Sequence, residues 1–143
     1  MKQIALVFII ALALNLLWEH LHYPLYDCSS ICAVRTLNQF SFIPLLIRAS
    51  FFDACFITAL YLCISFLHRS LSWTHTWRGA DTLIILAIGI TAASLIERSA
   101  LSAHKWAYSA AMPLVPFLAV GLSPFVQLAL LSLATYAIVA KLT

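Results

Sequence analysis

Three carboxylic acids, Glu19, Asp53 and Glu97, lie inside stretches of this chain that are otherwise apolar enough to cross a lipid bilayer. An ionisable side chain at membrane depth is costly, so it is by default a candidate functional residue. Carboxyl groups held away from water can exchange protons near neutral pH, which general acid–base catalysis requires. The three positions therefore predict proton-transfer chemistry within a membrane, with these side chains as candidate catalytic groups.

Glu19 belongs to a set of polar residues at helical spacing. The set follows intervals of four, three and four residues and consists of Asn15, Glu19, His22 and Tyr26. At 3.6 residues per turn these positions share one face, if the helix continues past Pro24 or Tyr26 follows in a turn. We expect His22 to orient the acid, with Asn15 and Tyr26 contacting substrate. The alternative is an aromatic belt at the water boundary.

Asp53 has no polar partner on its own helix face except one serine. Its neighbours three and four positions away are small or apolar. Asp53 must therefore be protonated or paired with a group from another helix. Gln127 is the expected partner in a site that binds and orients substrate, whereas a purely structural clasp to Gln127 or Asn15 is the alternative.

The segment after Glu97 supplies aromatic and cationic candidates. We expect Trp106 and Tyr108 to line a pocket, although the same residues also suit an interfacial belt. An anionic head group would be held by a cationic side chain. The candidates for that role are Arg48, Arg98 and Lys105.

Metal and cofactor motifs are weak or missing in this sequence. Glu19 and His22 form one Glu-x-x-His spacing, whereas metal sites in helical bundles use several such ligands from facing helices. We expect no bound metal and no cofactor. Cys28 and Cys32 lie in one connection, where a disulfide could persist in an oxidising compartment, but their spacing alone does not establish one.

The composition identifies the solvent of the fold as lipid. Of 143 residues, 64% are hydrophobic and 9% are charged, with a mean hydropathy of +1.00. A soluble domain carries about 25% charged residues. The net charge of +3 comes from scattered basic residues, which argues against a nucleic-acid surface and fits membrane topology signals.

Four segments are long and apolar enough to span a bilayer, namely about 4–21, 43–67, 82–101 and 114–142. They predict an all-α, polytopic four-helix bundle that forms a single membrane domain over 1–143. The first segment resembles a signal peptide, but no small-residue cleavage site follows it. The fourth helix is expected to be broken or kinked: it either begins at Pro124 or begins near Pro116 and bends at Pro124.

The basic residues predict how the bundle is oriented. Four of them mark one side (Lys2, Arg69, Arg78 and Lys141) and two mark the other (Arg35 and Lys105). The positive-inside rule then puts both termini in the cytoplasm. With that topology the polar candidates gather in the outer half of the bundle.

Three motifs together resemble a family of small, uncharacterised four-helix bacterial inner-membrane proteins. They are Asn15-x-x-Trp18-Glu19-x-x-His22-x-x-Leu25-Tyr26, then Trp106-x-Tyr108-x₃-Met112-Pro113, then Gly121-Leu122-Ser123-Pro124-x-x-Gln127-Leu128. The resemblance spans most of the chain and implies the bacterial inner membrane as its location. It supports the same candidate residues but implies no particular reaction.

These features favour a small intramembrane enzyme that acts on a lipid from the outer leaflet. The substrate classes expected are isoprenoid, sterol-like or acyl lipids. The alternatives are a proton- or cation-coupled carrier and a structural or assembly subunit whose polar groups only join helices. Membrane lipid is the expected partner, nucleic acid is not, and a homo-oligomer is compatible with the small size.

Overall fold

The computed structural model describes residues 2–27 and 43–143, and most of them are helical. Four long helices dominate: α1 (Lys2–His22), α3 (Ile43–His68), α4 (Gly79–Ser102) and α5 (Leu122–Leu142). Each of the four is long and apolar enough to cross a membrane. The predicted all-α architecture with four such helices is thereby confirmed. Cys28, Cys32 and Arg35 lie outside the described residues.

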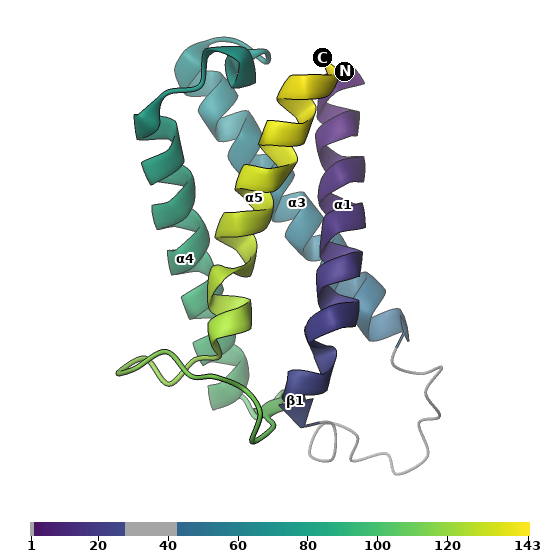
Figure 1. Cartoon of the computed structure of the whole chain (residues 1–143), viewed down its shortest axis with the longest axis vertical. Helices are drawn as coiled ribbons and strands as arrows, with labels where there is room; N and C mark the ends of the chain where they lie inside the picture. The colour runs from purple at the N-terminus through teal and green to yellow at the C-terminus, as the bar shows by residue number, and fades with distance from the viewer. Residues whose placement is uncertain (1, 28–42) are drawn as a thin grey trace.

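The helices run up and down, so that both termini lie at the same end of the bundle (Figure 1). α5 packs against α4 on one side and α1 on the other, while α1 also packs along α3. Figure 1 shows α3 and α4 spreading apart toward the end opposite the termini. This divergence leaves room between them at that end.

The fourth helix begins at Leu122, two residues before Pro124, and continues without a break to Leu142. Gly121 is its N-cap with extended backbone angles, so Pro124 falls in the first turn, where a missing N–H breaks no helical hydrogen bond. The expectation of a helix that starts near Pro116 and bends at Pro124 is therefore wrong. Residues 113–121 instead form a non-helical loop.

The connection after α1 brings two distant segments together. Pro24 ends regular helix, and a 3₁₀ turn (η1, Tyr23–Leu25) leads into β1 (Tyr26–Asp27). β1 pairs antiparallel with β2 (Ala107–Tyr108), with Tyr26 opposite Tyr108. Tyr26 thus reaches the site from a turn, which is the second of the two routes considered from the sequence.

The end of the bundle near the termini is filled with aromatic side chains. Trp73, from the 3₁₀ helix η3 (Trp73–Thr76), is fully buried, with its ring centroid 5.6 Å from Tyr61 and 5.5 Å from Tyr136. Beside it, His68 Nε2 lies 2.9 Å from Asp81 Oδ1. Side chains therefore close this end, and the polar candidates lie at the other.

Candidate functional site

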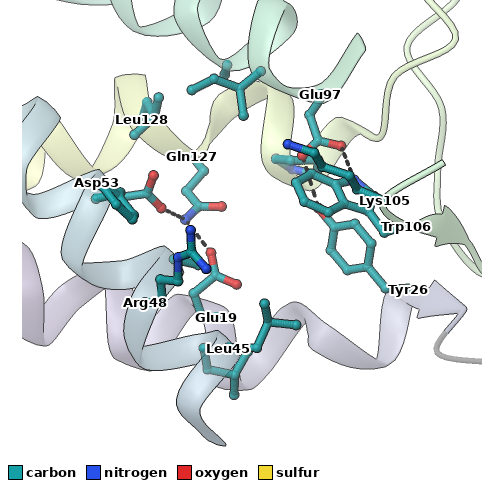
Figure 2. A pocket seen from close by; sticks show the side chains of 16 residues that line it. Glu19, Tyr26, Leu45, Arg48, Asp53, Glu97, Lys105, Trp106, Gln127 and Leu128 are labelled. Carbon is teal, nitrogen blue, oxygen red and sulfur yellow. Dashed lines mark hydrogen bonds between the residues drawn. The ribbon is translucent and has the colours of Figure 1, made fainter. Parts of the chain in front are cut away.

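A cavity of about 590 Å³ opens between α3 and α4 where these helices diverge. All four long helices contribute to its lining, and Figure 2 shows the polar side chains pointing into it from different elements. The polar or charged residues of the lining are Glu19, Tyr26, Arg48, Asp53, Glu97, Lys105, Trp106 and Gln127. The structure therefore brings the three carboxylic acids singled out in the sequence to one space.

Gln127 is the centre of the first polar group in the cavity. Its amide nitrogen, Nε2, lies 2.9 Å from Glu19 Oε1 and 2.9 Å from Asp53 Oδ2 (Figure 2). The same nitrogen lies 3.1 Å from Asn15 Oδ1. Gln127 is only 5% exposed and Asn15 is fully buried. α5 thus presents one amide to acceptors from α1 and α3, and we call these four residues the Gln127 centre.

The Gln127 centre has fewer donors than acceptors. An amide nitrogen carries two hydrogens, and here three oxygens converge on it. No Lys or Arg forms an ion pair with Glu19 or Asp53 among the described residues, where the ion pair found is His68–Asp81. Two carboxylates against one nitrogen repel each other when both are ionised. Glu19 and Asp53 are thus held beside one shared amide without a cation as partner in the described structure.

Glu97 is the centre of a second group with the opposite character. Its Oε1 accepts from the Tyr26 hydroxyl at 3.3 Å, and its Oε2 accepts from Trp106 Nε1 at 3.2 Å and from the Tyr108 hydroxyl. Glu97 is 5% exposed. Three neutral donors around one carboxylate stabilise its ionised form. Together, these four residues form the Glu97 centre.

The two tyrosines of the Glu97 centre donate their hydroxyl hydrogens to Glu97. Burial raises the pKa of the Tyr26 hydroxyl above its ordinary value of 10.0, and the charge of Glu97 raises it further. Burial likewise raises the pKa of Tyr108, as does its hydrogen bond to Glu97. Both hydroxyls therefore stay protonated at physiological pH.

The mouth of the cavity is apolar with cations beside it. Lining residues on the sides of α3 and α4 are half exposed, namely Phe52 at 58%, Ile96 at 49% and Leu45 at 45%. The Arg48 guanidinium lies 5.8 Å from the Phe52 ring centroid, and Lys105 lines the cavity from the segment after α4. Both cations are exposed and form no ion pair within the described part of the chain. A molecule with an apolar body and an anionic head would match this mouth.

Four candidate residues lie outside the cavity lining. Asn15 and Tyr108 contact it only through the Gln127 and Glu97 centres, and the other two are Arg98 and His22. Arg98 is exposed and points away from the Glu97 centre, because consecutive helical residues differ by about 100° around the axis. Arg98 was expected to hold substrate, and the structure places it outside this cavity. His22 is buried behind the Glu97 centre: its Nδ1 lies 2.9 Å from the Trp18 carbonyl and its ring packs against Tyr26. His22 thus contacts Tyr26, and none of its recorded hydrogen bonds involves Glu19.

The apolar walls were missed in the sequence. Phe52, Ile96 and Pro124 line the cavity, yet each is an ordinary residue of an apolar segment. Their positions are the one signal that could have indicated them. Phe52 precedes Asp53, Ile96 precedes Glu97, and Pro124 lies about one turn before Gln127.

The geometry defines a class, namely an apolar four-helix bundle with two carboxylate centres in one half. Comparison with protein-family models, with curated proteins and with solved structures finds no match. Among the described residues, no group of three or more His, Cys, Asp and Glu side chains could hold a metal ion.

Proposed function

We propose that the protein is a small intramembrane enzyme that carries out acid–base chemistry on a lipidic substrate. The observation that carries this proposal is the contrast between two carboxylate centres that share one cavity. Pairs of titratable groups in opposite environments are typical of acid and base partners. Here the Gln127 centre offers one amide nitrogen to three acceptors, and the Glu97 centre offers three donors to one carboxylate.

The roles of the carboxylates follow from that contrast. Glu19 and Asp53 act together as the general acid, while Gln127 holds them in position. Glu97, with its three hydrogen-bond donors, acts as the general base, or as the anion that stabilises positive charge developing in the substrate. Two groups on different walls can then add a proton at one atom and remove one from another.

The substrate class follows from the cavity's lining and mouth. Apolar walls suit an isoprenoid, sterol-like or acyl chain, which would enter sideways between α3 and α4 past Phe52 and Ile96. Arg48 and Lys105 would bind an anionic head group. Because the cavity is in the half opposite the termini, a cytoplasmic location of both termini makes the outer leaflet the source of substrate.

The membrane assignment is part of the same proposal. Four helices of sufficient length and apolarity support it. The resemblance described above supports the bacterial inner membrane, and the excess of basic residues near the termini and in the 69–78 region supports cytoplasmic termini.

The test compares lipids that co-purify with the protein and with carboxyl-to-amide variants. We expect Asp53→Asn and Glu97→Gln to retain the substrate lipid, whereas the unaltered protein carries less of it or carries its product. Chromatography coupled to mass spectrometry separates substrate from product even if they are isomers. Asp81→Asn is the matched control, because Asp81 belongs to the aromatic end and does not line the cavity.

Two results would overturn this proposal. One is that no lipid is enriched over an unrelated membrane protein purified in parallel. The other is that the lipid profile is the same in the unaltered protein, the two site variants and the Asp81→Asn control.

A further inference from the structure

The loop before α5, residues 113–121, is apolar along its whole length. From Ala110 to Leu122 no residue carries a polar side chain. The loop is nevertheless exposed: Leu114 is 54%, Leu118 is 37% and Phe117 is 107% exposed. A contiguous exposed apolar surface of this kind marks contact with a membrane or with another protein.

The loop has an ordered backbone that satisfies several of its own polar groups. Val115 N–H donates to Val120 O at 2.8 Å, and Leu122 N–H donates to Pro113 O at 2.7 Å. Leu114 and Gly121 form an antiparallel bridge. Segments in contact with lipid need such internal hydrogen bonds, because acyl chains offer none.

Phe117, at the tip of the loop, has an uncommon backbone conformation. Its φ is 67°, in the left-handed region that bulky side chains rarely occupy, and Ala119 follows with a φ of 54°. Unfavourable backbone conformations persist where they serve a function. Here the turn directs a large aromatic side chain fully outward.

The base of the loop is fixed to the bundle beside the site. The sulfur of Met112 packs so closely on Gly121 that a Cβ atom at Gly121 would lie 2.7 Å from it. Figure 1 shows the loop projecting sideways past α4, at the end opposite the termini. A sideways projection keeps the tip level with the ends of the helices, where the aromatic Trp106 and Tyr108 also lie.

We propose that the loop 113–121 is a membrane anchor whose tip inserts into the leaflet at the end opposite the termini. Leu114, Phe117 and Leu118 would lie among the upper acyl chains and extend the lipid-facing surface of α4 and α5. The occupant of this surface is thus bilayer lipid. The inference rests on the proposed membrane location, because an anchor of this kind requires the four helices to span the bilayer.

The test measures the depth of nitroxide labels in the full chain with its native cysteines replaced by alanine. The labelled variants are Phe117→Cys, Leu95→Cys and His104→Cys, in vesicles of phosphatidylethanolamine and phosphatidylglycerol. Leu95 is a lipid-facing control on α4, at 62% exposure, and His104 is an exposed polar control. Paramagnetic resonance compares the access of oxygen, which enters lipid, with that of a water-soluble nickel chelate.

We expect the label at Phe117 to favour oxygen and to lie about 5–10 Å below the phosphates. The Leu95 label should favour oxygen as well, and the His104 label should favour nickel. A nickel-accessible label at Phe117 beside a lipid-facing Leu95 label would overturn the anchor alone. An immobile Phe117 label shielded from both reagents would mean that protein, such as a second copy, covers the loop, and it would also overturn the anchor. Nickel access at Leu95 too would instead overturn the membrane assignment.

Discussion

Gln127→Leu should destabilise the bundle, because Gln127 provides the one amide group that joins α1, α3 and α5. Leucine has a similar size but no donor, so Glu19, Asp53 and Asn15 each lose a hydrogen bond of 2.9 to 3.1 Å. A buried acceptor left without a partner costs about 1–3 kcal/mol. Protonation of one carboxyl group offsets part of this loss, so we expect a net destabilisation of about 2–4 kcal/mol.

Adding Asp53→Asn to Gln127→Leu should reduce the destabilisation that Gln127→Leu causes alone. The asparagine amide brings two N–H donors to the same place and removes one of the two acidic groups. Alone, Asp53→Asn should leave the free energy of unfolding unchanged or slightly raised, because no cation pairs with Asp53 in the described structure. We expect the double variant to be about 1–2 kcal/mol more stable than the sum of the single changes.

The assay is unfolding by SDS in mixed micelles, followed by far-ultraviolet circular dichroism. Gln3→Leu is the matched control, since Gln3 makes a surface hydrogen bond to Thr143 and should cost less than about 0.5 kcal/mol. The reasoning is refuted if Gln127→Leu costs no more than this control. Strictly additive changes in the double variant would contradict the shared-donor geometry even if Gln127→Leu is destabilising.

Two further predictions concern packing and pH. Gly89→Ala should lower the free energy of unfolding by about 1–3 kcal/mol in the same assay, because a Cβ there would lie 2.7 Å from the backbone of Ala129 in α5. Gly79→Ala is the control and should not destabilise, because a Cβ at Gly79 meets nothing within 4 Å. The pKa of Tyr108 is higher in the folded protein than in the unfolded chain, so the unfolded chain loses this proton first. The free energy of unfolding should therefore fall as the pH rises above about 10. Tyr108→Phe should make the stability curve flatter above that pH, and an equally steep curve would contradict the buried-donor role.

The sequence was sufficient to predict the elements, because the signal for each is carried by many residues. Runs of apolar residues made the four helices visible, and the helix ends differ from the predicted bounds by a few residues, except for the fourth. The predicted start of the fourth helix depended on a choice between Pro116 and Pro124. In the structure the decisive feature is Gly121, whose contact with Met112 fixes the loop and lets the helix begin at once.

The site was predictable in its members but not in its grouping. Spacing identified Asn15 and Glu19 on one face, and the cost of burying Asp53 implied a partner from another helix. The sequence could not show that Gln127 contacts all three of them, because that depends on how α5 is rotated and how deep it lies. Arg98 shows that the sequence could also suggest a residue that the helix rotation excludes. Because Glu97 faces inward, the next residue, Arg98, faces outward.

The asymmetry of the bundle bears on the choice between enzyme and carrier. A carrier needs polar groups that lead toward both faces, and a proton or cation needs sites that can hold charge along the way. Near the termini, the Tyr136 hydroxyl donates to the Ile57 carbonyl at 2.6 Å and the Tyr61 hydroxyl donates to Leu71. His68 and Asp81 are paired with each other. These four titratable groups are thus engaged in local contacts around the buried Trp73.

The middle of the bundle contains further buried polar groups. Ser50, Ser132 and Thr135 have buried hydroxyls without a hydrogen-bond partner in the described structure. A hydroxyl can bind a water molecule or pass on a proton, so Ser50→Ala, Ser132→Ala and Thr135→Ala are the variants that would interrupt a proton path toward the aromatic end. The carboxylates therefore face a space that opens sideways at one end of the bundle and is closed by aromatic side chains at the other. That geometry lets a substrate enter and leave by the same side, which suits the proposed reaction, whereas net transport would need a second opening.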